Sequence, residues 1–270
     1  MKPPDKNPQA TATKSAKHSE GFRKRTITPL QFVGAVTSIA TEAPSLRKIW
    51  VDREMDPGLR EKLMVAVARY NEAKYCSWAH HEWAVIEGVS AKELAHIEQM
   101  DCTHVDPKTS LAITFVRELI ATNFGRVSKA RMQRMRARYS EEEIRQITLV
   151  AKVMDALNLS SNTFDAFLSR ISGKPSRTGR IIDEAIMAAI VCCAFPPFFA
   201  FFSRGSNSSI GAVVRRMIEY TTKMDAQSAS MKQLRKVTAP LRKQREGLRK
   251  PAAGPRRENG QRLARVALAT

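Results

Sequence analysis

The longest apolar run of the chain limits the folds that are open to it. From Ala185 to Phe202 there are 18 consecutive residues without a charge, and five of them are phenylalanine. The run is at the lower length limit for crossing a bilayer, and Pro196-Pro197 predicts a break into two short pieces, which argues against a straight span. Two interpretations are left. The run packs on a protein core or across an oligomer interface, or it lies at the surface of an anionic membrane together with the basic residues that follow it.

The positive charge of the chain belongs to its ends. The formal net charge is +19, and residues 1–26 hold seven basic and two acidic residues, whereas residues 203–270 hold sixteen and four. Residues 27–202 are nearly balanced, with 22 basic and 20 acidic residues. This distribution predicts a near-neutral domain with cationic arms and argues against a basic globular nucleic-acid domain. Because the basic tail lacks interleaved aromatic residues, we expect any contact with nucleic acid to be weak and unspecific.

The middle of the chain has the periodicity of helices. Leu59, Leu63, Val67 and Tyr70 share one helical face, and no window alternates with period two for long. The sequence therefore predicts an all-α fold. Residues that favour the first turn of a helix predict further starts at Thr28-Pro29, Asp56-Pro57, Ser90, Asp106-Pro107, Ser128 and Ser140.

Composition divides the chain into four parts. Residues 1–26 and 225–270 are polar and basic, which predicts disordered arms. Residues 27–170 form the predicted helical domain, and Gly173–Gly179 is a predicted linker. Residues 180–224 are then an apolar and amphipathic helical extension.

The cysteines and the start of the chain indicate a reducing compartment. There are four cysteines, and no two of them form a C-x-x-C pair. The first 26 residues have no apolar stretch of the kind that secretory signals contain. We therefore expect a cytoplasmic protein, with membrane association as the alternative that the apolar run leaves open.

Cys76 and His80 are the candidate reactive pair. They are four residues apart, so on a helix both side chains lie on one face. A thiol at a helix N-terminus beside a histidine favours the thiolate, which predicts a lowered pKa and makes Cys76 the most readily alkylated of the four thiols. The alternative is structural, with Cys76 as a small buried apolar residue and His80 as a hydrogen-bonded core group.

Three segments in the same order resemble a known family. They are Leu59–Tyr70 followed by Asn-Glu-Ala-Lys-Tyr-Cys-Ser-Trp-Ala-His, then Asp-Pro-Lys-Thr-Ser-Leu-Ala-Ile-Thr-Phe from Asp106, and then Tyr-Ser-Glu-Glu-Glu-Ile-Arg-Gln-Ile-Thr-Leu from Tyr139. Over residues 27–170 the chain is similar to the carboxymuconolactone decarboxylase and alkyl hydroperoxidase D-like superfamily. The resemblance implies a helical, oligomeric protein. The peroxidase branch of the family carries a Cys-x-x-Cys-x-x-x-His motif.

The resemblance assigns roles to individual residues. Cys76 matches the nucleophilic cysteine of the family motif, His80 matches its histidine, and Glu61 stands where a helix before the motif carries a proton-relay glutamate. Ala73 stands where the resolving cysteine would be, so an active Cys76 would pass through a sulfenic acid that an external thiol reduces. Cys102 would resolve it only if the fold brought the two together.

The sequence thus favours one function and leaves two others open. The favoured function is a thiol-dependent peroxidase that acts on a hydroperoxide or another small organic substrate, with a thiol reductant and no bound cofactor. The others are decarboxylase-type chemistry in the same fold, and a scaffold or membrane-associated protein with little activity. No metal site is predicted, because His80 and His81 point to different sides of a helix and Cys76 adds no recognisable ligand spacing.

Overall fold

The computed structural model describes residues 22–176 and 179–228, and the regular secondary structure of these residues is helical. The predicted all-α class is confirmed. The chain divides into two units, one that ends at Thr221 and one that begins at Thr222, and residues 222–228 of the second are helical. The labelled helices of the first unit are α1 (Pro29–Ala40), α2 (Ala43–Trp50), α3 (Pro57–Tyr70), α4 (Lys74–Ile86), α5 (Ala91–Glu98), α6 (Pro107–Ala121), α7 (Lys129–Arg136), α8 (Glu141–Ile171) and α9 (Ile181–Gly205). A further helix follows them from residue 210.

Local caps explain where these helices begin. Thr28 and Ser140 close capping boxes at the starts of α1 and α8, in which side chain and backbone satisfy each other's free N–H groups. The Asp56 and Asp106 carboxylates accept from backbone N–H groups in the first turns of α3 and α6. A proline follows each aspartate, where its missing N–H has no consequence.

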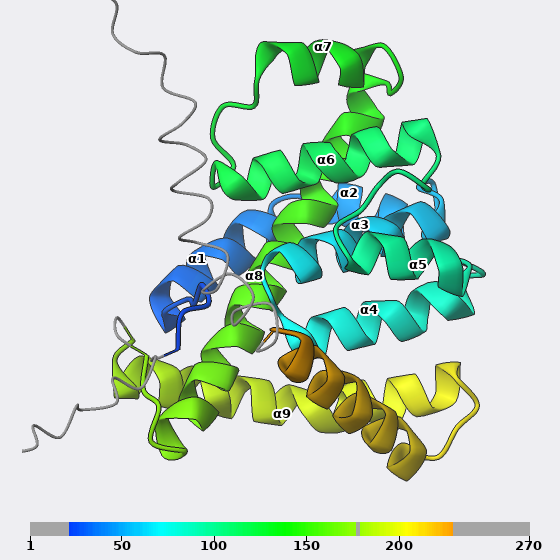
Figure 1. Ribbon diagram of the computed structural model, residues 1–270. Coiled ribbons are helices and arrows are strands. Elements are labelled where there is room, and N and C mark those ends of the chain that lie inside the picture. The colour runs from blue at the N-terminus through cyan, green and yellow to red at the C-terminus, as the bar shows by residue number, and fades with distance from the viewer. Residues whose placement is uncertain (1–21, 177–178, 229–270) are drawn as a thin grey trace, which may run out of the picture. The chain divides into compact units, whose positions relative to one another are not determined.

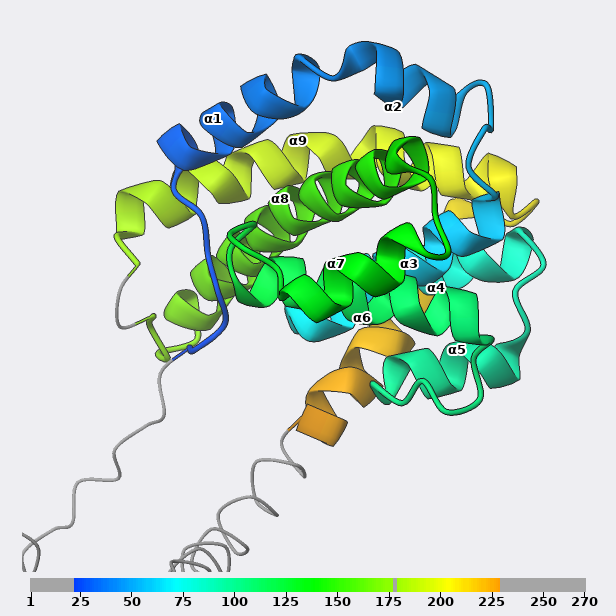
Figure 2. The same ribbon diagram turned by 90° about the horizontal axis from the view of Figure 1, so that it is seen from above.

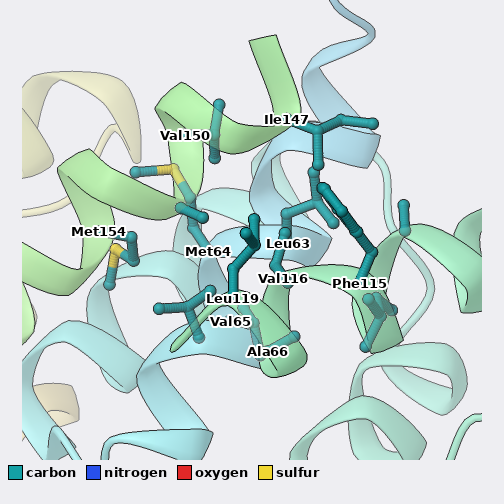
Figure 3. Close-up of a cluster of buried hydrophobic side chains, with 14 of the residues drawn as sticks. Leu63, Met64, Val65, Ala66, Phe115, Val116, Leu119, Ile147, Val150 and Met154 are labelled. Carbon is teal, nitrogen blue, oxygen red and sulfur yellow. The ribbon is translucent and has the colours of Figure 1, made fainter. Parts of the chain in front are cut away.

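The core of the first unit is built around α3. Residues 63–68 are all buried, so this helix is covered on every side. Figures 1 and 2 show α4, α5, α6 and α8 around it, and all four contact it. In Figure 3, Leu63 of α3 lies near Phe115 and Val116 of α6 and Ile147 of α8, whereas Met64 points toward Val150 of α8. Full burial of one such side chain stabilises the fold by about 1.5–3 kcal/mol.

α9 is one continuous helix, so the predicted break at Pro196-Pro197 is wrong. Proline removes a backbone hydrogen bond and costs about 3 kcal/mol in a helix interior. Here the packing on the C-terminal side of the prolines holds the helix together, because Phe198, Phe199 and Phe202 surround Trp78 of α4. Met187 and Ala188 are buried on the other side of the prolines.

Lys24 and Arg25, which belong to the predicted N-terminal arm of residues 1–26, contact the helical domain. Lys24 Nζ lies 2.8 Å from an Asp165 carboxylate oxygen, and Arg25 Nη1 lies 3.2 Å from Asp155 Oδ1, both on α8. The remaining arm, residues 1–21, and most of the predicted tail, residues 229–270, lie outside the described residues.

The helix that starts at residue 210 is attached to the core through Glu98. Tyr220 Oη donates to Glu98 Oε1 at 2.5 Å, and His81 Nδ1 lies 2.8 Å from the same oxygen. The hydrogen bond to Glu98 raises the pKa of His81. Burial alone would raise the pKa of Glu98, but the bonds from His81 and Tyr220 outweigh burial and lower it.

These two shifts predict a pH window for the attachment. Because folding raises the pKa of His81, protonated His81 stabilises the fold fully below about pH 6.5, and this contribution is lost as the pH rises further. Because folding lowers the pKa of Glu98, ionised Glu98 stabilises the fold above about pH 4.5, and this contribution is lost at lower pH. Glu98→Gln is therefore expected to lower the free energy of unfolding by about 1–3 kcal/mol between these values, and less on either side. Denaturant unfolding across pH measures it, with exposed Glu141→Gln as the control. A difference that is flat from pH 4 to 9 would contradict it.

Candidate active site

Glu61 and His80 meet between two neighbouring helices. α3 carries Glu61 and α4 carries His80, and the Nδ1 atom of His80 lies 2.7 Å from Glu61 Oε2. Cys76 is in the first turn of α4, one turn before His80, because α4 begins at Lys74. The structure thus places the three predicted residues in one region.

Glu61 is a buried carboxylate that stays charged. Its side chain is 2% exposed, and its second oxygen accepts from Arg60 Nε at 2.9 Å. Burial alone would raise the pKa of Glu61, but the hydrogen bond and charge of His80 and the charge of Arg60 outweigh burial and lower it. An ionised carboxylate only accepts hydrogen bonds, so Nδ1 of His80 is the donor to Glu61, and Nε2 is the ring nitrogen that remains for another partner.

Cys76 and His80 open into the same apolar cavity. It has a volume of about 250 Å³ and lies between α4 and α8 on one side and α1 and α9 on the other. The residues that line it are Phe32, Tyr75, Cys76, Trp78, Ala79, His80, Leu157, Ser160, Ser161, Ile190, Val191, Ala194, Phe195, Phe198 and Met217. The aromatic walls suit the apolar body of a small organic molecule.

Two buried polar groups on these walls lack partners of their own. The indole Nε1 of Trp78 has no hydrogen bond among the described residues, and Ser161 Oγ has none apart from its approach to the Cys76 thiol. Buried donors without partners are uncommon in proteins.

The thiol of Cys76 does not have the predicted lowered pKa. Burial raises the pKa of Cys76 to about 11, and the nearby Ser161 hydroxyl offsets a smaller part of the shift. The thiol lies 3.7 Å from the carbonyl oxygen of Leu157 on α8. The prediction failed because it counted the helix N-terminus and His80, whereas the loss of hydration against α8 has the larger effect.

The four thiols are therefore expected to react with an alkylating reagent in the opposite order to the one that the sequence predicts, with Cys76 slower than the exposed cysteines. Cys192 and Cys193 are exposed and should react with iodoacetamide before Cys76. In a variant that retains only Cys76, the alkylation rate should rise with a midpoint near 11. A midpoint at or below about 8.5, the value of an ordinary thiol, would contradict this. Mass spectrometry of the alkylated peptides measures both results.

The other candidates from the sequence lie elsewhere. Cys102 Sγ is 3.4 Å from Arg117 Nη1, and Cys102 is not among the residues that line the cavity with Cys76. His81 is bound to Glu98, and Trp83 stacks on Phe201 with ring centroids 4.8 Å apart. In the described part of the chain, no three histidine, cysteine or acidic residues are grouped as metal ligands would be.

Sequence reasoning did not identify several contributors to the site. Arg60 stands next to Glu61 in the sequence and fixes its charge, but an arginine in the first turn of a helix gives no local sign of burial. Phe195 and Phe198 of α9 line the cavity, although the apolar run was treated as separate from the site. A long-range contact of this kind has no local signal in the sequence.

Comparison with known proteins leaves the resemblance as a hypothesis. No protein-family model matches the chain, and neither a curated protein nor a solved structure gives a match. The side chains at the cavity are therefore the basis for a proposed function.

Proposed function

We propose that the protein is a thiol-dependent peroxidase-like oxidoreductase with an alkyl hydroperoxidase D-like helical domain. Cys76 is the nucleophile, and His80 and Glu61 are the proton relay. The observation that carries the proposal is the 2.7 Å contact between Glu61 and His80, in which Glu61 orients an imidazole that lines the same cavity as a cysteine. Activated nucleophiles use this arrangement, in which a carboxylate orients the base and the base removes the proton of the nucleophile.

The raised thiol pKa determines how such a reaction would begin. With a pKa of about 11, roughly one thiol in ten thousand is ionised at neutral pH. His80 Nε2 therefore has to remove the thiol proton when substrate enters, and the charged Glu61 stabilises the imidazolium that forms. Loss of water from the cavity on substrate binding strengthens this charge pair.

The chemistry then balances with an external thiol. The Cys76 thiolate attacks the terminal peroxide oxygen, the O–O bond breaks, and the alkoxide that leaves takes the proton from His80. This gives a sulfenic acid on Cys76 and an alcohol. One external thiol condenses with the sulfenic acid and releases water, and a second frees Cys76 as a disulfide of the external thiol forms. Ala73 leaves no internal cysteine at the usual resolving position.

Peroxide consumption tests the proposal. We expect the purified chain, with cumene hydroperoxide and dithiothreitol, to consume peroxide faster than the protein-free mixture, and more rapidly as the pH rises. Cys76→Ser should reduce the rate to that of the mixture alone. Cys102→Ser is the matched control, and it should keep the full rate. Full activity in Cys76→Ser would show that the thiol is not the nucleophile.

One observation favours a second function. The Glu61–His80 pair needs no thiolate, and the Cys76 pKa of about 11 suits a cavity residue without a nucleophilic role. His80 would then act as the acid–base catalyst of a decarboxylase-type reaction. The Cys76→Ser variant would keep this activity, and the His80→Ala variant would lose it. A chain without either activity would support the scaffold interpretation. The expected homo-oligomer is part of the proposal, and size-exclusion chromatography with light scattering tests it.

A further inference from the structure

α9 has two apolar sides, and the protein covers one of them. Its inner side packs on α4 and α8, where Phe202 is 4% exposed. Its outer side is also apolar, with Ile182 61% exposed, Ile186 45% and Phe201 58%. α9 is long and apolar enough to cross a membrane, and 17% of its most apolar window is buried within the protein. The outer side has no charged residue from Ala185 to Phe202.

α1 continues this exposed surface. It contains no charged residue and no buried residue, and Leu30 is 83% exposed, Val33 59% and Val36 46%. α1 contacts both α8 and α9, and Figure 2 shows it running alongside α9. We call the exposed apolar residues of the two helices the outer face. It consists of Leu30, Val33, Val36, Ile181, Ile182, Ile186, Ile190 and Phe201.

Cations flank the outer face. Arg180 precedes the first residue of α9 and Arg204 is in its last turn, both exposed, and neither forms an ion pair among the described residues. Of the acidic residues in the first turn of α9, Glu184 is buried against Arg170 at 2.7 Å, which leaves Asp183 as the one partly exposed. From residue 203 to the end, Arg204 included, the sequence holds sixteen basic and four acidic residues.

We propose that the outer face binds an anionic lipid bilayer, with α9 lying in the plane of the interface. Apolar side chains bounded by arginines match the acyl boundary and the negative headgroups of such a surface. A second copy docked through the same face fits less well, because it would add two more arginines to Arg180 and Arg204 and only Asp183 as a partly exposed acidic residue from the first turn of α9. A bilayer span also fits less well. It would detach Phe202 from Trp78 and expose Glu184, whose ion pair with Arg170 fixes the start of α9 on α8.

Vesicle sedimentation of the full chain tests the proposal. One set of vesicles is phosphatidylcholine alone, and the other contains about one-third phosphatidylglycerol. We expect binding to the mixed vesicles and much weaker binding to phosphatidylcholine. Ile182→Glu/Ile186→Glu should weaken binding at least about tenfold, since it removes two apolar anchors and adds two negative charges. Val51→Glu/Val85→Glu is the matched control, because both valines are exposed outside α1 and α9.

A second part of the experiment replaces the two flanking arginines. Arg180→Gln/Arg204→Gln should weaken binding to the anionic vesicles roughly tenfold or more, at about fivefold for each charge. Arg126→Gln/Arg138→Gln, which changes two exposed arginines far from α9 in sequence, should change it little. Circular dichroism confirms that each variant keeps its helicity.

Four results would overturn the proposal. The full chain could fail to bind either vesicle. Ile182→Glu/Ile186→Glu could bind as the unaltered chain does, which would assign binding to the basic residues alone. The same variant could convert an assembly into a smaller one without changing vesicle binding, which would make the outer face a contact between copies. Resistance of the bound chain to extraction by alkaline carbonate would indicate a span instead.

Discussion

Glu61→Ala is expected to lower the free energy of unfolding by about 3–5 kcal/mol. The substitution leaves the Arg60 guanidinium buried, with its side chain 6% exposed, and removes its partner at 2.9 Å. It also removes the partner of His80. Arg60 then keeps only the longer pair with Glu87, whose Oε1 lies 3.8 Å from Arg60 Nη2 and which also pairs with Arg53. A buried charge that loses its close partner is costly, because water does not reach it to compensate. Chemical denaturation at neutral pH measures the change.

A matched substitution at the surface separates this effect from that of removing any glutamate. Glu141 pairs with Arg136 at 2.8 Å, but the two side chains are 68% and 60% exposed. Glu141→Ala should therefore cost no more than about 1 kcal/mol. If Glu61→Ala cost as little, the Arg60–Glu61–His80 arrangement would not exist in solution.

Phe202→Ala is expected to destabilise the protein by about 3–5 kcal/mol. The Phe202 ring lies 5.3 Å from the Trp78 ring and 5.1 Å from the Trp83 ring, centroid to centroid, and it is 4% exposed. Its removal opens a cavity in the cluster that joins the end of α9 to α4. Thermal and denaturant unfolding give the size of the loss.

The neighbouring phenylalanine is the control. Phe201 stacks on Trp83 but is 58% exposed, so Phe201→Ala leaves no closed cavity and should cost about 1 kcal/mol. Equal losses for the two variants would show that α9 is not seated on α4 as described. The test requires no assumption about the activity of the protein.

Helix starts were predictable from the sequence because they depend on neighbouring residues. Thr28, Asp56, Ser90, Asp106 and Ser140 each cap the helix that follows, since a side chain two or three residues from a free N–H needs no distant partner. The family resemblance named Glu61 and His80 as site residues, but it left open whether they meet. Nothing in the spacing of the two residues requires α3 and α4 to pack side by side.

What the sequence did not reveal depends on contacts between distant residues. The pKa of Cys76 is determined by α8, which begins more than 60 residues later, and local reasoning gave the wrong direction. The continuity of α9 through Pro196 depends on its contacts with Trp78. The place of Phe195 in the cavity wall has the same origin, because α9 comes to the site only through tertiary packing.

The position of α9 in the chain affects how the protein folds during synthesis. A helix that is apolar on two sides aggregates readily when it is exposed before its partners exist. Here α3, α4 and α8 precede α9 in the sequence, so the surface that receives Phe202 is translated before Phe202 itself. A circular permutation that begins at residue 177 would reverse this order. We expect it to lower the yield of soluble protein during expression, even where the folded product is equally stable.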